Sequence, residues 1–474
     1  MKIVIAGAGI SGLATYHYLR KHLPNPPAPA PPHTIRIYET YRPRPSGASP
    51  SPDADPFEAL STSTALVGGG LGVSSNGMRV LRDLDPAIYQ AVAKQGFPCE
   101  RIIFMGQNGW ALGVKETNDK GGFEGPSGRA EVCVSSTRHG LWACLMAAMP
   151  EGVVQYKKIT DVEILGQGGK KVMRLEDGTE EECDLLIGAD GVKSTVRKVL
   201  FGEDKCGREY RPLYTGVSWV GGFISGPLPS RVADHNAMVF HLGRHGFLGY
   251  ASASPAEANS LMWWSTWETD SPPTRGSANH KSIKAGMQAR HGKWADPIVQ
   301  AILSQAEVET IYPIWALPDL PSWGRDGIVL TGDAAHALSP TTAQGACQAL
   351  EDAQTMSLLL AGTLTRAYSA RQEDATASPP ALWAEEEKEA VERTIKLFYD
   401  IRLPRVSAIA ERGRALDGKK NVSILEEYAM YCFIWVMINF PSLVRFLMGD
   451  LDAEIVNWSA RKEVAKALAA LDSV

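Results

Sequence analysis

A glycine pattern at the N-terminus restricts the fold of this chain more than any other feature. Gly7, Gly9 and Gly12 follow an apolar run at residues 2–6, and a helical pattern covers residues 10–23. In such a strand–turn–helix unit the first glycine permits a tight turn, the second lets backbone amides approach a pyrophosphate, and the third lets helix and strand pack closely. The helix N-terminus then supplies a partial positive charge for phosphates. The pattern predicts a Rossmann-like α/β domain that binds a dinucleotide.

A carboxylate is expected where the second strand of such a domain ends. The predicted strand at residues 34–38 is followed by Glu39, which can accept hydrogen bonds from a ribose diol. Its distance from the glycines exceeds the usual ~20 residues. Six prolines within residues 24–32 indicate an extended surface insertion that accounts for the excess. The alternative interpretation is a glycine-rich turn with a surface glutamate.

Composition narrows the class of protein. The chain has 474 residues, of which 44% are hydrophobic and 21% charged, and its formal net charge is -5, so we expect a globular protein without a nucleic-acid partner. Seven scattered cysteines without a CxxC pair predict neither a disulfide framework nor a metal site. The apolar start runs directly into glycines and is interpreted as a strand, not as a signal peptide. These features predict a cytoplasmic protein, and they leave its oligomeric state open.

The longest apolar stretch lies near the C-terminus, at residues 428–448. Asn439 and Pro441 interrupt it, whereas a membrane span needs ~20 apolar residues. We therefore expect no transmembrane span and predict a buried helix or a helix that caps the active site. Contact with a membrane surface is the alternative.

Two further strand-then-turn units resemble the first. Apolar runs at residues 184–191 and 327–333 each end in Gly and Asp, as buried parallel strands do when their carboxyl ends face a ligand. Between them, alternating patterns at 237–242, 247–252 and 260–267 predict an antiparallel sheet as a second layer. Helices are expected from residue 345 to 360, from 383 to 398 and from 404 to 416.

These two units carry motifs of a known family. The sequence Thr331-Gly332-Asp333, followed by Pro340 and Gly345, resembles the GD motif of flavoprotein hydroxylases, and Asp190-Gly191 resembles their DG motif. A carboxylate can accept bonds from ribityl hydroxyls, and a helix N-terminus can stabilise a reduced, anionic flavin. His336, within the GD motif, is interpreted as structural, and Arg402 and Arg405 as salt-bridged helix residues.

Over nearly its whole length the chain resembles the single-component FAD-dependent aromatic hydroxylases, the group of para-hydroxybenzoate hydroxylase. Among these it resembles the salicylate-hydroxylase-like monooxygenases of fungal secondary metabolism. The resemblance implies FAD as cofactor and NAD(P)H as a transient co-substrate, with insertion of one oxygen atom from O2 into a small molecule. Because only one GxGxxG is present, we expect no separate NAD(P)H domain. The expected FAD-binding residues are Gly7, Gly9, Ser11, Gly12, Glu39, Gly69, Gly70, Arg138, Asp190, Gly332, Asp333, Pro340, Gly345 and Ala346.

The expected domain organisation follows from the same resemblance. The fold class is α/β, with a Rossmann-like FAD-binding domain, an inserted antiparallel-sheet substrate domain and a C-terminal helical region. Residues 1–74, 128–205 and 321–365 are assigned to the FAD-binding domain, 75–127 and 206–320 to the substrate domain, and 366–474 to the helical region.

Departures from the family pattern bear on the substrate. The arginine that steadies a phenolate in many members is missing from residues 214–222, where Trp219 stands instead, and Thr341-Thr342-Ala343 replaces a glycine-containing turn. An aromatic, indole-like or polyketide-type substrate held by Trp219, Tyr250, Trp263 and Trp264 is therefore a hypothesis. These side chains are equally suited to a sheet core. No catalytic residue is assigned.

Two other functions remain open at this point. The same fold supports an FAD-dependent oxidase or dehydrogenase that uses no external NAD(P)H. A non-enzymatic flavin-binding or escort protein is the third hypothesis, but it would leave the turn at residues 340–345 without a use.

Overall fold

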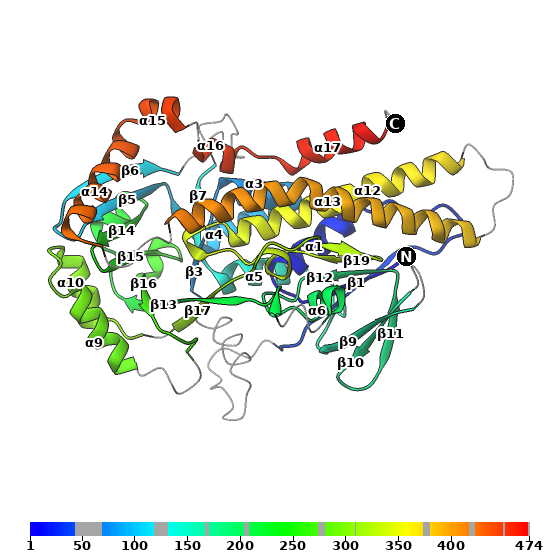
Figure 1. Cartoon of the computed structure of the whole chain (residues 1–474), viewed down its shortest axis with the longest axis horizontal. Helices are drawn as coiled ribbons and strands as arrows, with labels where there is room; N and C mark the ends of the chain where they lie inside the picture. The colour runs from blue at the N-terminus through cyan, green and yellow to red at the C-terminus, as the bar shows by residue number, and fades with distance from the viewer. Residues whose placement is uncertain are drawn as a thin grey trace.

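The structure is a computed structural model that describes residues 1–42, 69–117, 131–165, 170–202, 208–273, 280–308, 310–372, 380–416, 422–448 and 451–472. Residues 43–56, whose Pro, Ser and Asp content predicts a second loop, lie outside these residues. Figure 1 shows a parallel sheet beside two long helices and a large antiparallel sheet at the opposite end of the molecule.

A six-stranded sheet contains the three strand-then-turn units. Its order is β18-β19-β12-β1-β2-β8, and all neighbours pair in parallel except β18 and β19. The strands are β1 (Lys2–Ala6), β2 (Thr34–Tyr38), β8 (Val154–Gln155), β12 (Leu185–Gly188), β18 (Gly324–Arg325) and β19 (Ile328–Leu330). Strands β12 and β19 are buried over their whole length, as expected for a parallel sheet covered on both faces. The carboxyl ends of β1, β12 and β19 therefore lie at one edge, each followed by a glycine turn.

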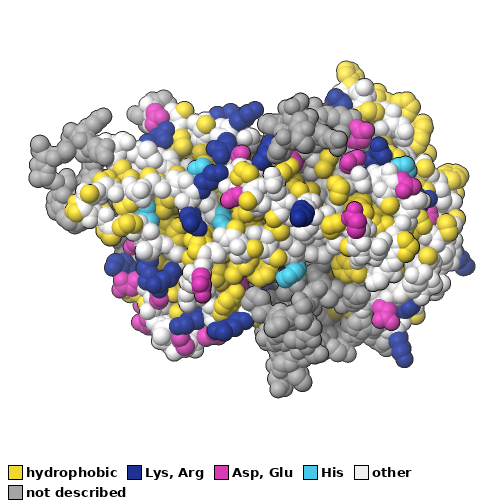
Figure 2. Space-filling view, turned by 180° about the vertical axis from the view of Figure 1, so that it is seen from behind, with side chains coloured by type: hydrophobic (Ala, Val, Ile, Leu, Met, Phe, Trp, Pro, Cys, Tyr) yellow, Lys and Arg dark blue, Asp and Glu magenta, His cyan; other side chains and the backbone are white. Residues whose placement is uncertain are grey.

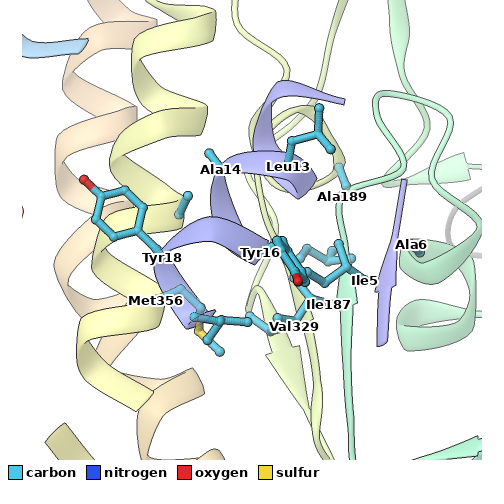
Figure 3. Close-up of a cluster of buried hydrophobic side chains, with 14 of the residues drawn as sticks. Ile5, Ala6, Leu13, Ala14, Tyr16, Tyr18, Ile187, Ala189, Val329 and Met356 are labelled. Atoms are coloured by element: carbon cyan, nitrogen blue, oxygen red, sulfur yellow. The ribbon is translucent and has the colours of Figure 1, made fainter. Parts of the chain in front are cut away.

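The core of this sheet lies against α1 (Ile10–His22), which in turn packs on α12 (Gly345–Gln372). Figure 3 shows Ile5, Ile187 and Val329 of neighbouring strands beneath α1, with Met356 of α12 beside them. The Tyr18 hydroxyl, on the same helix, donates to the carbonyl oxygen of Val80 at 2.6 Å. The first core thus joins segments that are far apart in the sequence.

A seven-stranded sheet forms the second layer, in the order β17-β13-β16-β15-β14-β5-β6. Its strands are β5 (Arg101–Gly106), β6 (Ala111–Glu116), β13 (Leu213–Ser225), β14 (Ala237–Gly243), β15 (Gly246–Ser252), β16 (Ser260–Glu268) and β17 (Thr310–Ala316). One face packs on α9 (His280–His291) and α10 (Pro297–Gln305), and the other face carries a smaller aromatic cluster. All neighbouring strands pair antiparallel except β5 and β14, so the predicted antiparallel sheet is confirmed in all but this pair.

Two three-stranded sheets and several short helices complete the fold. One three-stranded sheet consists of β3 (Gly70–Val73), β7 (Cys133–Thr137) and β4 (Phe97–Cys99), and another of β9 (Ile159–Ile164), β10 (Lys171–Leu175) and β11 (Glu180–Cys183). The short helices are α3 (Ser75–Leu84), α4 (Pro86–Gln95), α5 (Arg138–Ala147), α6 (Thr195–Phe201), α8 (Ser230–Ala233), α11 (Asp333–His336), η1 (Ala256–Ala258) and η2 (Pro340–Thr342). The buried side chains of α3 and α4 belong to the core of the parallel sheet.

The C-terminal region is helical, as predicted, but its helices differ from the expected ones. The helix α13 (Pro380–Leu416) continues through Pro404, where the sequence predicted a break. Its buried Arg402 and partly buried Arg405 are ion-paired to Glu351 of α12. These ion pairs stabilise the helix before and after Pro404, which has no amide N–H to donate. The remaining helices are α14 (Ile424–Asn439), α15 (Pro441–Met448), α16 (Leu451–Val456) and α17 (Ala460–Leu471). For residues 428–448 the expected burial is wrong, because α14 and α15 expose large apolar side chains, while a helix that caps the active site stays a prediction.

Gly12→Ala tests the close packing of the first turn. A Cβ atom on Gly12 would lie 2.0 Å from the Gly7 carbonyl oxygen, whereas a Cβ atom on Gly9 would meet no atom within 4 Å. We expect Gly12→Ala to lower the free energy of unfolding by about 1–3 kcal/mol, because backbone atoms must shift. Gly9→Ala, the matched control, should change it by less than about 0.5 kcal/mol. Urea unfolding without added dinucleotide measures both, and equal effects would contradict the proposed packing.

Candidate functional site

The first turn leaves an open, amide-lined concavity at the end of β1. Gly7 adopts a positive φ of 101°, and its amide donates to the Tyr38 carbonyl oxygen at 2.7 Å. A Cβ atom on Gly7 would lie 2.4 Å from the Ala189 carbonyl oxygen, so this position must be glycine. Next to it, Gly9 has open space where a side chain would be, and no side chain caps the N-terminus of α1 there. This geometry fits a pyrophosphate bound by backbone amides.

Glu39 closes one side of this turn. Its carboxylate accepts hydrogen bonds from the Ala8 amide at 2.7 Å and the Tyr41 amide at 2.9 Å. Burial raises the pKa of the Glu39 carboxyl, although these backbone bonds oppose the shift. Glu39 therefore lies beside the glycine turn, where the prediction of a ribose contact requires it.

Asp190, at the end of β12, has two distinct carboxylate oxygens. Oδ2 accepts from the amides of Thr195 and Val196 at 2.7 and 3.1 Å, and so caps α6. Oδ1 is buried and has no hydrogen-bond partner among the residues that the structure describes. Burial also raises the pKa of this carboxyl. A buried acceptor without a partner is costly, so Asp190 fits a ligand group at this edge of the sheet as well as its capping role.

The third turn lies directly against the first. The Ser11 hydroxyl donates to Thr331 Oγ1 at 3.0 Å, and a Cβ atom on Gly332 would lie 3.0 Å from Cβ of Ser11. Asp333 then starts α11 with an exposed side chain, and the structure records no hydrogen bond to its carboxylate from any described residue. Its carboxylate can accept ribityl hydroxyls, as the GD motif predicts.

A buried ion-pair network holds the third turn from behind. Asp352 Oδ2 accepts from the Gly332 amide at 2.8 Å and lies 2.6 Å from His336 Nε2. Its other oxygen accepts from Nε of Arg402 at 2.8 Å, and Arg402 also donates to Glu351 at 2.7 Å. Burial alone would raise the pKa of the Asp352 carboxyl, but the proximity of His336 and Arg402 outweighs burial and lowers it. This contact supports the structural interpretation of His336.

Gly69 and Gly70, at the start of β3, lie where the two sheets meet. The Gly69 amide donates to the Tyr312 hydroxyl of β17 at 3.1 Å, and a Cβ atom on Gly70 would lie 2.0 Å from Met262 Sδ of β16. Arg138 starts α5 beside them, with an exposed side chain and its amide donating to the Gly69 carbonyl oxygen at 3.3 Å. Tyr312 and Met262 could not be identified from the sequence, because their contacts with glycine leave no local pattern.

The turn before α12 contains a strained residue. Ala343 has a φ of 50° after the turn that begins with Pro340, in the segment where the family pattern has a glycine-containing sequence. Gly345, the first residue of α12, has open space around its Cα, while Ala346 is partly buried against the first core. The Gln344 carboxamide accepts from Asn76 at 3.0 Å and donates to the Ser74 hydroxyl at 3.2 Å. Contacts from α3 therefore fix this turn.

The four candidate substrate residues divide between the two faces of the seven-stranded sheet. Trp263 and Tyr250 are 1% and 0% exposed and belong to the core under α9 and α10, where Tyr250 accepts from Arg231 at 3.0 Å. Trp264 and Trp219 belong to the aromatic cluster on the other face, with Met262. Neighbouring residues of a strand point to opposite faces, so Trp263 cannot share a pocket with Trp264.

The described residues contain no group of three or more His, Cys, Asp or Glu side chains placed to hold a metal ion. The polar groups at the sheet edge are instead backbone amides and separate carboxylates, which suits an organic cofactor with phosphates and hydroxyls.

Comparisons with known proteins support this interpretation. A family model described as an FAD binding domain matches residues 70–378. The chain is 28% identical over 386 residues to a salicylate hydroxylase of Pseudomonas putida, covering 77% of this chain and 78% of that protein. It is 27% identical over 325 residues to an FAD-dependent monooxygenase, eupB, of Phoma sp, covering 64% and 70%.

A solved structure shows the same fold. Klebsiella pneumoniae HpxO, complexed with FAD and uric acid, matches with a TM-score of 0.65 at 17% identity over 93% of this chain and 95% of that one. At such low identity the structural match supports the fold alone. Together with the family model, it confirms the predicted α/β architecture and FAD as the cofactor, and the chain therefore belongs to the FAD-binding family of flavoprotein monooxygenases.

Proposed function

We propose that this protein uses NAD(P)H and O2 to insert one oxygen atom into an apolar, aromatic small molecule, of an indole-like or polyketide type, in secondary metabolism. One observation supports the proposal most strongly. The edge of the parallel sheet, with its open glycine turn and available carboxylate of Asp333, meets the aromatic face of the second sheet at Gly70. A cofactor extended along that edge would end beside an apolar surface.

The residues of the edge have separate tasks in this proposal. The amides around Gly9 hold the pyrophosphate, Glu39 the ribose diol and Asp333 the ribityl chain, while Arg138 and the amides before Gly345 lie toward the flavin end. FAD, when bound, supplies the electron transfer and oxygen activation that protein side chains cannot. The N-terminus of the long helix α12 favours negative charge nearby. The protein contributes orientation and exclusion of water.

The aromatic face supplies the substrate surface. Phe240 lies 5.6 Å from Trp264, and Trp219 lies 5.8 Å from Phe247, measured between ring centroids. The indole nitrogens of Trp219 and Trp264 are buried and have no hydrogen-bond acceptor among the described residues. Buried donors of this kind normally find a partner. We therefore propose a substrate with an apolar ring system and a carbonyl or ether oxygen that accepts from an indole N–H.

Anaerobic mixing with NADPH tests the use of an external reductant. We expect the flavin absorbance of the purified protein to bleach, and more rapidly when a substrate from an aromatic, indole or polyketide panel is present. Rapid mixing with diode-array detection measures the rate. An enzyme that is not bleached by NADPH or NADH, but is bleached by an organic substrate alone, would instead be the oxidase or dehydrogenase considered above.

Replacing single tryptophans tests the substrate face. Trp219→Phe keeps the ring character and removes one buried N–H, so we expect KM for the substrate to rise roughly two- to tenfold, the value of one neutral hydrogen bond. Trp263→Phe is the matched control, because its indole nitrogen is equally buried and unpaired but lies on the opposite face. Steady-state kinetics should show an unchanged KM for that control. An unchanged KM for Trp219→Phe would remove this side chain from the proposed pocket.

A further inference from the structure

The helices α14 and α15 carry an unusually large exposed apolar surface. We call it the apolar corner and define it by the exposed side chains Ile424, Leu425, Tyr428, Phe433, Trp435, Phe440, Leu443, Phe446 and Leu447. Leu425 is 83% exposed and Phe446 86%. In Figure 2 hydrophobic side chains gather at the upper right edge, the position of α14 and α15 when Figure 1 is turned. Large exposed apolar patches usually mark an interaction site.

Helix α14 is anchored to the protein through Tyr431 and Ile438. The Tyr431 hydroxyl accepts from the Gln107 amide at 3.0 Å and lies 2.8 Å from the Leu242 carbonyl oxygen and 2.7 Å from the carboxylate of Glu427. Two turns further along the helix, Ile438 packs on Gly113 of β6, where a Cβ atom would lie 2.6 Å from Cγ2 of Ile438. Residues 427, 431 and 438 lie on one face of the helix, since they are four and seven residues apart. The anchoring keeps the helix in place while its other sides stay exposed.

The other sides of α14 are apolar too. Leu425, Phe433 and Trp435 point in different directions around the helix axis, because each residue advances the helix by about 100°. A helix that is hydrophobic on all sides is normally enclosed, either by a protein core or by lipid. Residues 428–444 contain no charged side chain, and the exposed charges between residues 424 and 447 are Glu426 and Arg445.

The shape of the corner favours lipid over a second copy of the chain as the occupant. A rigid partner in a two-fold interface would cover one side of α14, whereas fluid hydrocarbon can surround several sides at once. The lack of charge from residue 428 to 444 complements hydrocarbon, while Glu426 and Arg445 stand near the two ends, where head groups and water would lie. Tyr428 and Trp435 have the amphipathic rings that are enriched at membrane interfaces.

The dimensions of the corner indicate attachment to one leaflet. Among the described residues, no helix by itself has the length and apolar character of a membrane span. Ile424–Asn439 and Pro441–Leu447 have them only together, and the two helices are bent by 99°. The 16 residues of α14 extend about 24 Å, less than the ~30 Å hydrocarbon core. We propose that the apolar corner inserts into one leaflet of a phospholipid bilayer and holds the protein at the membrane surface.

This placement has a consequence for access to the protein. Helix α14 packs against β6, the edge strand of the seven-stranded sheet that also carries the aromatic face. Insertion of the corner would hold that sheet, rather than the parallel sheet, next to the lipid. Membrane attachment does not rest on the proposed reaction, because vesicle binding is measured without turnover.

Flotation of the full-length, flavin-loaded protein with phosphatidylcholine vesicles tests the proposal. We expect the protein to float with the vesicles, and the double variant Phe446→Ser/Leu447→Ser to bind at least roughly tenfold more weakly, because two exposed side chains leave the hydrocarbon. The matched control is Leu165→Ser/Leu213→Ser, since these residues are 46% and 48% exposed and lie outside the corner. The control should float like the original protein.

Three results would overturn the proposal. The first is that the original protein floats neither with phosphatidylcholine vesicles nor with vesicles containing phosphatidylserine. The second is that the corner variant floats as well as the control variant. The third is that no protein floats, while sedimentation velocity shows a dimer for the original protein and the control but a monomer for the corner variant. The last result would assign the corner to a second copy of the chain. Flavin absorbance and circular dichroism of both double variants establish that they fold, which their exposed positions favour.

Discussion

The carboxylate of Asp352 is the interaction on which the flavin site depends. It is fully buried, and it binds the Gly332 amide, His336 and Arg402 at the same time. Arg402 is itself buried and shares its charge with Glu351. Removing one partner of such a buried ion pair typically costs about 3–5 kcal/mol, because the remaining charge stays buried without compensation. The network therefore fixes the turn that presents Asp333, and it does so from helices that the sequence places up to 70 residues later.

The site forms because three strands end at one edge of a parallel sheet. Gly7 contacts the end of β12 through the Ala189 carbonyl oxygen, and Gly332 contacts Ser11 of the first helix. The backbone approach at Gly7 excludes a side chain, and the φ of 58° at Gly332 favours glycine, while Gly9 leaves open space for a ligand. The same edge then meets the second sheet through Gly69 and Gly70. Packing between the sheets and cofactor binding are thus properties of the same few turns.

Much of this site could be predicted from the sequence because its residues lie at strand ends with local motifs. Gly7, Glu39, Asp190 and Asp333 each follow an apolar run, and the parallel order of the strands brings them to one edge. A resemblance to a known family was still needed to distinguish FAD from other dinucleotides. The contact of Tyr312 with Gly69 and the ion pair of Asp352 with Arg402 join residues that are far apart in the sequence. No local pattern marks such contacts.

Two other differences have a clear physical cause. Trp263 and Trp264 lie on opposite faces of the seven-stranded sheet because side chains alternate along a strand. Which of these faces lies toward the parallel sheet depends on the packing of β3 against Met262, which the sequence does not show. The helix break expected near Pro404 does not occur, because ion pairs of Arg402 and Arg405 stabilise α13 on both sides of the proline. The exposed apolar corner was recognised in the sequence as an apolar stretch, yet its exposure depends on the tertiary anchoring of Tyr431.

The central claim is that the turns after β1, β12 and β19 form one FAD site in which Asp333 holds the ribityl chain. Titration of FAD into flavin-free protein by calorimetry tests it most directly. The account predicts that Asp333→Ala weakens FAD binding by roughly tenfold or more, the value of one or two hydrogen bonds to a charged acceptor. Asp319→Ala, which removes an exposed carboxylate outside the motif, should bind FAD with unchanged affinity. Stoichiometric, equally tight binding by Asp333→Ala would contradict the account.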